Sequence, residues 1–330
     1  MDATNTERRR RWVLPLRIAV SLVLLGVLFT QIDDVDPSKI LPRWSLSSAL
    51  WLGGAGLLTF SGIALSTTRW QQVLTAMGVH SRWRYLFTTY LAGQFVSNVL
   101  PTTIGGDVLR VSRLSRENSQ APKTFASVVL ERLSGWIVLP LITFAGFAAN
   151  PGLRHLGRAS TVAIVIACGT LGGLILVVVL VADPRLGGRF SHHQGWQRFA
   201  GAVHLGITNL RHHPATALSV IGVGIIYQLV MVAAALMASR ALGTTAAGLT
   251  ALMAFLPAVL IVQVLPIGIS GLGVREAAFV LFLGPLGVTT EQAIGLGLLL
   301  YLLNLVTSLP GAPAFAMGPS RKRPATSIAA

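Results

Sequence analysis

The chain has 330 residues, of which 53% are hydrophobic and only 11% are charged, and its mean hydropathy is +0.68. This composition excludes an ordinary soluble domain and is typical of a protein with several membrane spans. The formal net charge is +15, but the arginines lie in short segments between apolar runs. Positively charged cytoplasmic loops therefore explain the charge better than nucleic-acid binding does.

Six segments have the roughly 20 mainly apolar residues that a membrane span needs. These predicted spans are Val13–Thr30, Leu46–Ser66, Leu133–Ala149, Ser160–Ala182, Ala215–Ser239 and Gln292–Met317. Four arginines precede the first of them, as in a signal peptide, but no small-residue cleavage site follows it, so we expect an uncleaved anchor. The sequence thus predicts an all-α integral membrane protein that forms a single membrane domain over residues 1–330.

Two further apolar stretches, Tyr85–Leu100 and Leu249–Leu265, are shorter, and each stops at a proline followed by glycines. We expect each stretch to be the first arm of a re-entrant helical hairpin, with Asp107–Arg116 and Val274–Leu286 as the returning arms. Irregular backbone at membrane depth persists only where protein or a water-filled cavity satisfies its polar groups. The two hairpins are therefore expected to lie next to a cavity or inside the bundle.

The distribution of lysine and arginine predicts the orientation, because cytoplasmic loops carry the excess of these residues. With the N-terminus inside and hairpins that do not cross, all but six of the 26 lie on the inner side or at its edge. Both termini, including the basic tail of residues 318–330, are then cytoplasmic. Each half has three spans and one hairpin, so the repeats 13–149 and 160–317 are inverted relative to each other, as in many secondary transporters.

The internal repeat is indicated by two matching segments, 99–110 and 264–275, which lie half a chain apart. Six of their twelve aligned positions are identical, including a proline, a glycine and the final arginine. These residue types are not generic filler of apolar segments, so they favour a true duplication. Proline and glycine also shape hairpin turns, and the predicted hinges are Pro101, Pro266, Gly271 and Gly273.

The longest polar segment, 183–214, contains apolar residues at intervals of three and four. This stripe consists of Trp196, Phe199, Val203, Ile207 and Leu210. It predicts an amphipathic helix in the cytoplasmic interface. The helix is either a linker that rests on lipid or a site for a partner or a signal.

Charged side chains at membrane depth are the candidate functional residues, because each costs about 2.5 to 3.5 kcal/mol on insertion scales. Gly105 and Gly106 are expected to open a helix whose N-terminus attracts an anion and on which Asp107 and Arg110 share one face. Arginine can hold a phosphate through two parallel hydrogen bonds. The predicted lipid-headgroup site comprises Asn98, Gly105, Gly106, Asp107, Arg110, Glu131, Arg132, Arg275 and Glu276. The alternative is that these charges form local ion pairs that keep the hairpins folded, or that Glu131 and Arg132 anchor a span edge.

Catalytic and metal-binding patterns are absent from the sequence. The single cysteine, Cys168, lies in an apolar run, and the seven histidines form no HExxH motif. The chain also lacks the GxxxxGKS/T loop of nucleotide-driven pumps and the GxSxG elbow of many hydrolases. We therefore expect neither an enzyme nor a bound metal or cofactor.

The sequence resembles a known family at three motifs: Asn98-x-x-Pro101-x-x-x-Gly105-Gly106-Asp107-x-x-Arg110, Ser127-x-x-x-Glu131-Arg132 and Gly271-x-Gly273-x-Arg275-Glu276. They are similar to those of the lysylphosphatidylglycerol synthase transmembrane, flippase-like family, which includes the membrane half of the multiple peptide resistance factor of bacteria. The resemblance implies a multi-pass protein of the bacterial inner membrane that moves a lipid between leaflets. Because only a short basic tail follows Met317, we expect no aminoacyl-transferase domain and no synthesis of an aminoacylated lipid.

Together, the motifs and the resemblance predict a lipid flippase or flippase-like transporter for a phospholipid or a polyprenyl-phosphate lipid. One alternative is a proton-coupled secondary transporter of a small solute, with Asp107 or Glu131 carrying the proton. The other is a non-transporting membrane partner that recruits a lipid-modifying enzyme through residues 183–214.

Overall fold

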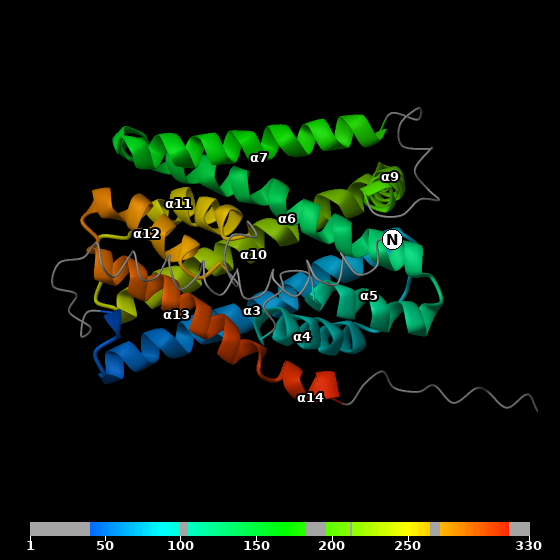
Figure 1. Ribbon diagram of the computed structural model, residues 1–330, viewed down its shortest axis with the longest axis horizontal. Coiled ribbons are helices and arrows are strands. Elements are labelled where there is room, and N and C mark those ends of the chain that lie inside the picture. Colours follow the sequence, from blue (N-terminus) through cyan, green and yellow to red (C-terminus); the bar gives the residue numbers. More distant parts are fainter. Residues whose placement is uncertain (1–39, 100–104, 183–195, 212, 265–270, 317–330) are drawn as a thin grey trace, which may run out of the picture.

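The computed structural model of the protein describes residues 40–99, 105–182, 196–211, 213–264 and 271–316. Every regular element within these ranges is a helix, as the composition predicts. Five of these helices are long and apolar enough to cross a membrane, and they run along the long axis of the molecule (Figure 1). They are α3 (Leu46–Ala76), α6 (Ala121–Ala149), α7 (Arg158–Ala182), α10 (Pro214–Ala241) and α13 (Thr290–Ser308). Five of the six predicted spans are thereby confirmed as helices, whereas Val13–Thr30 lies outside the described residues.

Two of the long helices extend well beyond the apolar runs from which they were predicted. Helix α3 continues past Ser66, and α6 begins far ahead of Leu133. The polar residues of the two extensions are bonded to each other inside the bundle; for example, the indole Nε1 of Trp70 donates to Ser127 Oγ at 3.0 Å. Buried polar groups are tolerated where they find such partners, so neither helix has to stop where its apolar run stops.

The last predicted span, Gln292–Met317, is interrupted in the structure. Helix α13 ends at Ser308, and a short helix, α14 (Gly311–Ala316), follows it. Pro310 lies between them, and a proline has no N–H group with which to continue the hydrogen-bond ladder of α13. The chain therefore bends here, and α14 packs against α4 (Trp83–Val99).

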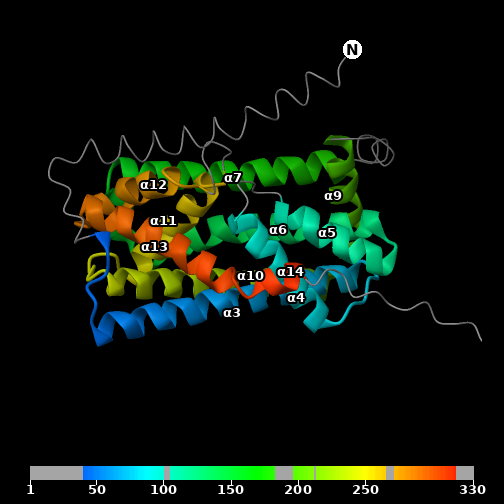
Figure 2. The ribbon, with the colours of Figure 1, turned by 60° about the horizontal axis from the view of Figure 1, so that its bottom comes forward.

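Two pairs of shorter helices lie at opposite ends of the bundle in both ribbon views (Figure 1, Figure 2). One pair is α4 with α5 (Gly105–Asn118), and the other is α11 (Leu249–Val262) with α12 (Val274–Leu283). Each of these four helices is shorter than the roughly 20 residues of a span. Their limits match the predicted hairpin arms, while the connecting residues 100–104 and 265–270, with Pro101 and Pro266, lie outside the described residues.

The packing of the helices follows the same scheme in both halves of the chain. Helix α3 lies against α10, α6 packs on α11 as α13 and α14 pack on α4, and α5 packs on α6 as α12 packs on α13. Corresponding helices of the two halves therefore have corresponding neighbours.

The two ends of the bundle differ in chemistry although their helices are arranged alike. At the α11/α12 end, Phe255 packs edge-on against Phe147 of α6, with 5.6 Å between ring centroids, and stacks on Phe282 of α12 at 5.5 Å. These rings belong to the largest buried apolar cluster among the described residues. The α4/α5 end buries a larger set of charged side chains, Arg110, Arg113 and Glu131, whereas α12 buries the pair Arg275 and Glu276. The polar site is therefore sought first at the α4/α5 end.

The predicted amphipathic helix is present as α9 (Trp196–Arg211), which lies against α6, α7 and α10. Val203, a residue of its apolar stripe, is fully buried and belongs to a cluster with Val129 and Leu130 of α6. The apolar stripe therefore packs against the bundle at Val203, whereas the linker interpretation placed the stripe on lipid. The bundle itself offers the apolar surface that the helix needs.

Candidate functional site

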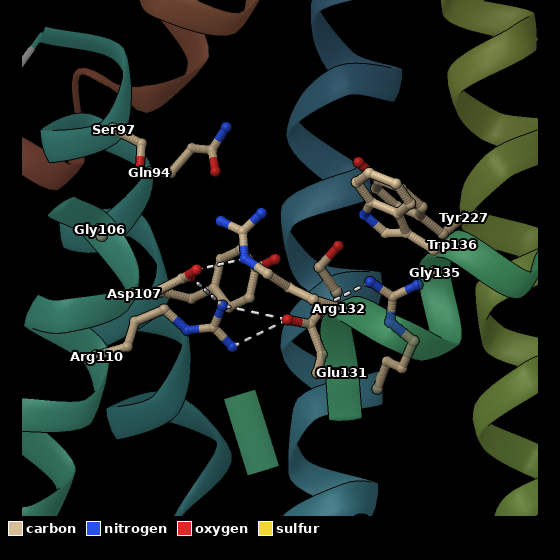
Figure 3. A pocket seen from close by; sticks show the side chains of 14 residues that line it. Gln94, Ser97, Gly106, Asp107, Arg110, Glu131, Arg132, Gly135, Trp136 and Tyr227 are labelled. Atoms are coloured by element: carbon tan, nitrogen blue, oxygen red, sulfur yellow. Dashed lines mark hydrogen bonds and ion pairs between the residues drawn. The ribbon is translucent and has the colours of Figure 1, made fainter. Parts of the chain in front are cut away.

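A polar cavity of about 210 Å³ lies at the α4/α5 end of the bundle, between α3, α4, α5, α6 and α10. Figure 3 shows that charged side chains from several of these helices converge on it. They are three arginines and two carboxylates: Arg69, Arg110, Arg132, Asp107 and Glu131. We refer to this set as the charge cluster.

Glu131 on α6 is the centre of the charge cluster. Its Oε1 accepts a hydrogen bond from Arg69 Nη2 on α3 at 2.5 Å, and its Oε2 accepts from Nη1 and Nη2 of Arg110 on α5 at 3.2 and 3.3 Å. The Glu131 side chain is only 2% exposed. A buried carboxylate is stable only when it is well paired, so Glu131 ties three helices together.

The second carboxylate, Asp107, lies near the start of α5 and also contacts two arginines. Its Oδ1 is 3.4 Å from Arg110 Nη1, and its Oδ2 is bonded to Nε of Arg132 on α6. Among the described residues that line the cavity, three arginines thus face two carboxylates, which leaves one formal positive charge in excess. A cavity with this balance attracts an anion.

The guanidinium group of Arg110 is held between two aromatic rings. Its Cζ lies 4.2 Å from the ring centroid of Trp70 on α3 and 4.2 Å from that of Tyr90 on α4. Each ring attracts the cation through its negative face. Together with Glu131, the rings fix the orientation of Arg110 before any ligand arrives.

Gly106 has a packing role that its place in the motif alone did not reveal. Helix α5 begins at Gly105, as predicted. A Cβ atom at Gly106 would overlap the carbonyl oxygen of Gly93 on α4 and the hydroxyl of Ser97. Only glycine permits this close approach of α4 and α5, which in turn brings Arg110 to the cavity.

Asn98 does not line the cavity. The side-chain Nδ2 of Asn98 donates to the backbone carbonyl of Asn304 on α13 at 3.1 Å. The backbone carbonyl of Asn98 accepts from the hydroxyl of Tyr301 at 3.3 Å. The residue therefore joins the end of α4 to α13 in the other half of the chain.

Arg275 and Glu276 lie on α12, at the other end of the bundle from the charge cluster. Arg275 Nη2 is 2.8 Å from Glu276 Oε1, and Glu276 Oε2 accepts the backbone N–H of Gly273 at 2.6 Å. Both side chains are buried, at 7% and 0% exposure, and the Arg275 guanidinium faces the ring of Tyr301 at 5.4 Å. The structure thus brings Gly106, Asp107, Arg110, Glu131 and Arg132 together but keeps Arg275 and Glu276 apart from them.

The predicted glycine hinges, Gly271 and Gly273, have φ angles of 76° and 84°. These angles favour glycine, and they form the turn that starts α12. No cluster of three or more His, Cys, Asp or Glu side chains suited to a metal occurs in the described ranges.

Sequence reasoning missed Arg69, which pairs with Glu131, and the aromatic residues Tyr90 and Trp136 of the cavity wall. A signal for Arg69 was available. Residues 67–76 contain neither glycine nor proline, so a helix entering them from the preceding span can continue and carry Arg69 into the bundle.

A family model described as "Lysylphosphatidylglycerol synthase TM region" matches residues 14–311. The chain belongs to this family. The matched region of the chain includes the five long helices and every residue of the charge cluster. The match confirms the resemblance that the motifs indicated. The protein is accordingly a multi-pass membrane protein related to proteins of lipid metabolism.

The chain is also similar to "Glycosyltransferase AglD" of Haloferax volcanii, with 25% identity over 178 residues. This similarity covers 51% of the chain and 28% of that protein, so the chain matches less than a third of the relative's length. No solved structure matches the chain.

Proposed function

We propose that the protein is a flippase-like transporter that moves an anionic, phosphate-bearing lipid between membrane leaflets. The observation that carries the proposal is the excess of arginine over carboxylate, among the described residues, in a cavity lined by the candidate membrane spans α3, α6 and α10 and by the α4/α5 pair. Uncompensated charge at membrane depth is costly, and the phosphate of a phospholipid or a polyprenyl-phosphate lipid would neutralise it. Membership of a family named for lysylphosphatidylglycerol, a phosphate-bearing lipid, supports the same substrate class.

In this proposal α4/α5 and α11/α12 are re-entrant hairpins that enter the membrane from opposite sides. Their short helices, their location at opposite ends of the bundle and the recurring packing scheme support an inverted repeat. The distribution of lysine and arginine supports cytoplasmic termini. The bacterial inner membrane is the expected location.

Transport would consist of binding, exchange of ion pairs and movement of helices. The headgroup enters the cavity while the acyl chains stay in the lipid phase. Its phosphate competes with Asp107 and Glu131 for Arg110, so the guanidinium changes its anionic partner without becoming unpaired. Movement of the α4/α5 pair against α6 then exposes the headgroup to the other side. No catalytic residue takes part in these steps.

A non-transporting partner of a lipid-modifying enzyme is the second candidate function. It is favoured by the similarity to a protein named as a glycosyltransferase, and α9 offers a docking element at the same end as α4/α5 (Figure 1). A proton-coupled transporter fits less well. Each carboxylate of the charge cluster contacts two arginines, which favours fixed counter-ions over proton carriers.

Transbilayer transfer in proteoliposomes tests the proposal. The protein is reconstituted with phosphatidylglycerol that carries a nitrobenzoxadiazole group on one acyl chain, with and without a pH gradient, and dithionite then bleaches the outer leaflet. We expect the wild-type protein to expose more label than protein-free vesicles do, and Arg110→Ala to abolish the difference. If wild-type vesicles match protein-free vesicles under both conditions, the transport proposal is wrong.

Mass spectrometry of copurifying lipids separates the candidate functions further. A phosphate-bearing lipid that is enriched over the bulk membrane, and lost in Arg110→Ala, supports headgroup binding in the cavity. Uptake of a soluble solute by proteoliposomes without such enrichment supports the small-solute transporter instead.

A further inference from the structure

An apolar groove of about 430 Å³ lies beside the polar cavity, on another face of α6. Leu130, Leu133 and Ile137 of α6 line it, at the helical spacing that places side chains on one face. Ala217 and Val220 near the start of α10 form the facing wall. The groove is thus enclosed by α3, α6, α7 and α10, and its wall is almost entirely apolar.

Arg69 lies where the groove and the cavity meet. It lines the cavity, while Val73, one turn further along α3, lines the groove. On α10, Val220 lines the groove and Tyr227 the cavity, and Gly224 between them faces the Arg69 guanidinium. The two spaces are therefore neighbours on both helices, with the guanidinium between them.

Part of the Arg69 guanidinium is left without an acceptor. Nη2 donates to Glu131, but Nε and Nη1 are buried and have no hydrogen-bond partner among the described residues. The Arg69 side chain is only 7% exposed. Buried donors of a charged group are almost always satisfied, so these two N–H positions require an oxygen that the described residues do not supply.

Two glycines border Nη1 of Arg69. A Cβ atom at Gly135 of α6 would lie 3.3 Å from Arg69 Nη1, and one at Gly224 of α10 would lie 3.5 Å from it. Any larger side chain at these positions would occupy the space where an acceptor oxygen has to lie.

We propose that Arg69 binds the phosphate of an anionic phospholipid through Nε and Nη1, and that one acyl chain of the same lipid lies in the groove between α6 and α10. This inference rests on the proposed function, which it deepens by adding Arg69 to Arg110 as a phosphate ligand and by naming the groove as the acyl subsite. The one excess positive charge among the described side chains of the cavity selects a net anionic headgroup over a zwitterionic one. The groove gives no hydrophobic gain over bulk lipid, since both are apolar. It therefore serves to align the lipid with the cavity.

Photo-crosslinking in nanodiscs tests the location of the lipid. The full-length protein is placed in phosphatidylcholine nanodiscs with a trace of phosphatidylglycerol that bears a diazirine midway along one acyl chain, and the labelled residues are mapped by mass spectrometry. We expect label on Leu133, Ile137, Ala217 and Val220. Unlabelled phosphatidylglycerol should compete, whereas inorganic phosphate at the same concentration should not.

Three variants and a control define the two halves of the site. Ala217→Phe fills the groove, so it should abolish most labelling there by excluding the acyl chain. Arg69→Gln removes the phosphate ligand and should lower labelling of the groove at least about tenfold, since losing even one charged hydrogen bond has this effect. Gly135→Ala should act like Arg69→Gln because it blocks Nη1 while keeping every charge. Ala215→Phe, at an exposed position two residues away, should change nothing.

The proposal is overturned if label spreads evenly over exposed residues of α7 such as Val165 and Val179, or if groove labelling survives Ala217→Phe. It is also overturned if inorganic phosphate competes as well as the lipid. If Arg69→Gln does not elute as a folded protein, groove labelling in Gly135→Ala alone decides whether Arg69 binds the phosphate. Crosslinking reads binding and not movement, so groove labelling without transfer in proteoliposomes would refute the proposed function and leave this inference standing. Lipid transfer without labelling of the groove would refute this inference and leave the proposed function standing.

Discussion

Arg69 and Glu131 lie 62 positions apart in the chain, and their side chains meet at 2.5 Å in the interior of the bundle. Glu131 is at the same time the partner of Arg110. One carboxylate thus compensates two buried arginines that belong to different helices. The stability of this end of the protein therefore depends on the negative charge of Glu131.

Glu131→Gln should destabilise the protein strongly, because it leaves two buried guanidinium groups without their common counter-ion. Breaking a buried pair by removing one partner costs about 3 to 5 kcal/mol. We expect a clear fall in the apparent unfolding temperature of the protein in detergent. Tryptophan fluorescence measures this temperature. Glu117→Gln on the exposed side of α5 is the matched control, and equal unfolding temperatures for the two variants would contradict the structural role of Glu131.

Arg110→Lys should impair lipid transfer although it keeps the charge. Lysine cannot bond Glu131 through two nitrogens and lacks the flat group that lies between Trp70 and Tyr90. We therefore expect a transfer rate about tenfold lower, the effect of losing one hydrogen bond to a charged group. The measurement is the initial rate of dithionite bleaching in proteoliposomes, with Arg116→Lys at an exposed position of the same helix as the control. Unchanged transfer in Arg110→Lys would mean that any cation suffices at this position.

Arg275→Ala should reduce stability without reducing the transfer rate of the folded fraction. Among the described residues, the substitution leaves the buried Glu276 with the backbone N–H of Gly273 as its remaining partner, and an uncompensated buried charge costs about 3 to 5 kcal/mol. Thermal unfolding is measured first, and lipid transfer is then measured on the same preparation at a temperature well below the unfolding transition. A selective loss of transfer with unchanged stability would instead assign Arg275 to the headgroup site, as its match to Arg110 in the sequence suggested.

The described spans and the helices of both pairs could be predicted from the sequence, because apolar length, proline and glycine act locally. The shared face of Asp107 and Arg110 also followed from a local argument, since residues three apart meet on one side of a helix. Glu131 was predicted in the same site only as one of several costly charges at membrane depth. Pairing with Arg69 could not be predicted in this way. Its partner is on another helix, and nothing in the residues around Arg69 specifies which carboxylate it meets.

The matched segments of the two halves show a second limit of sequence reasoning. Arg110 and Arg275 occupy equivalent positions, yet Arg110 faces a cavity and Arg275 pairs with the adjacent Glu276. Position 111, which corresponds to 276, is Val111 in the first half. Arg110 has no acidic neighbour there, so it pairs with Asp107 one turn earlier and with Glu131 of another helix. The second half also has Leu272 and Leu296 where the first half has Asp107 and Glu131. These differences between the repeats together separate a charged cavity from a closed ion pair.

Gly106→Ala should separate α4 from α5 and thereby disturb the cavity. A methyl group at this position overlaps the Gly93 carbonyl oxygen, and backbone cannot move away as cheaply as a flexible side chain. Inserting atoms into packed structure costs about 1 to 3 kcal/mol, which should appear as a lower unfolding temperature and a lower transfer rate. Gly172→Ala on α7, where nothing lies within 4 Å of the added atom, should be neutral or slightly stabilising because alanine favours helix. If both alanine variants behave alike, the close contact between α4 and α5 does not determine the geometry of the site.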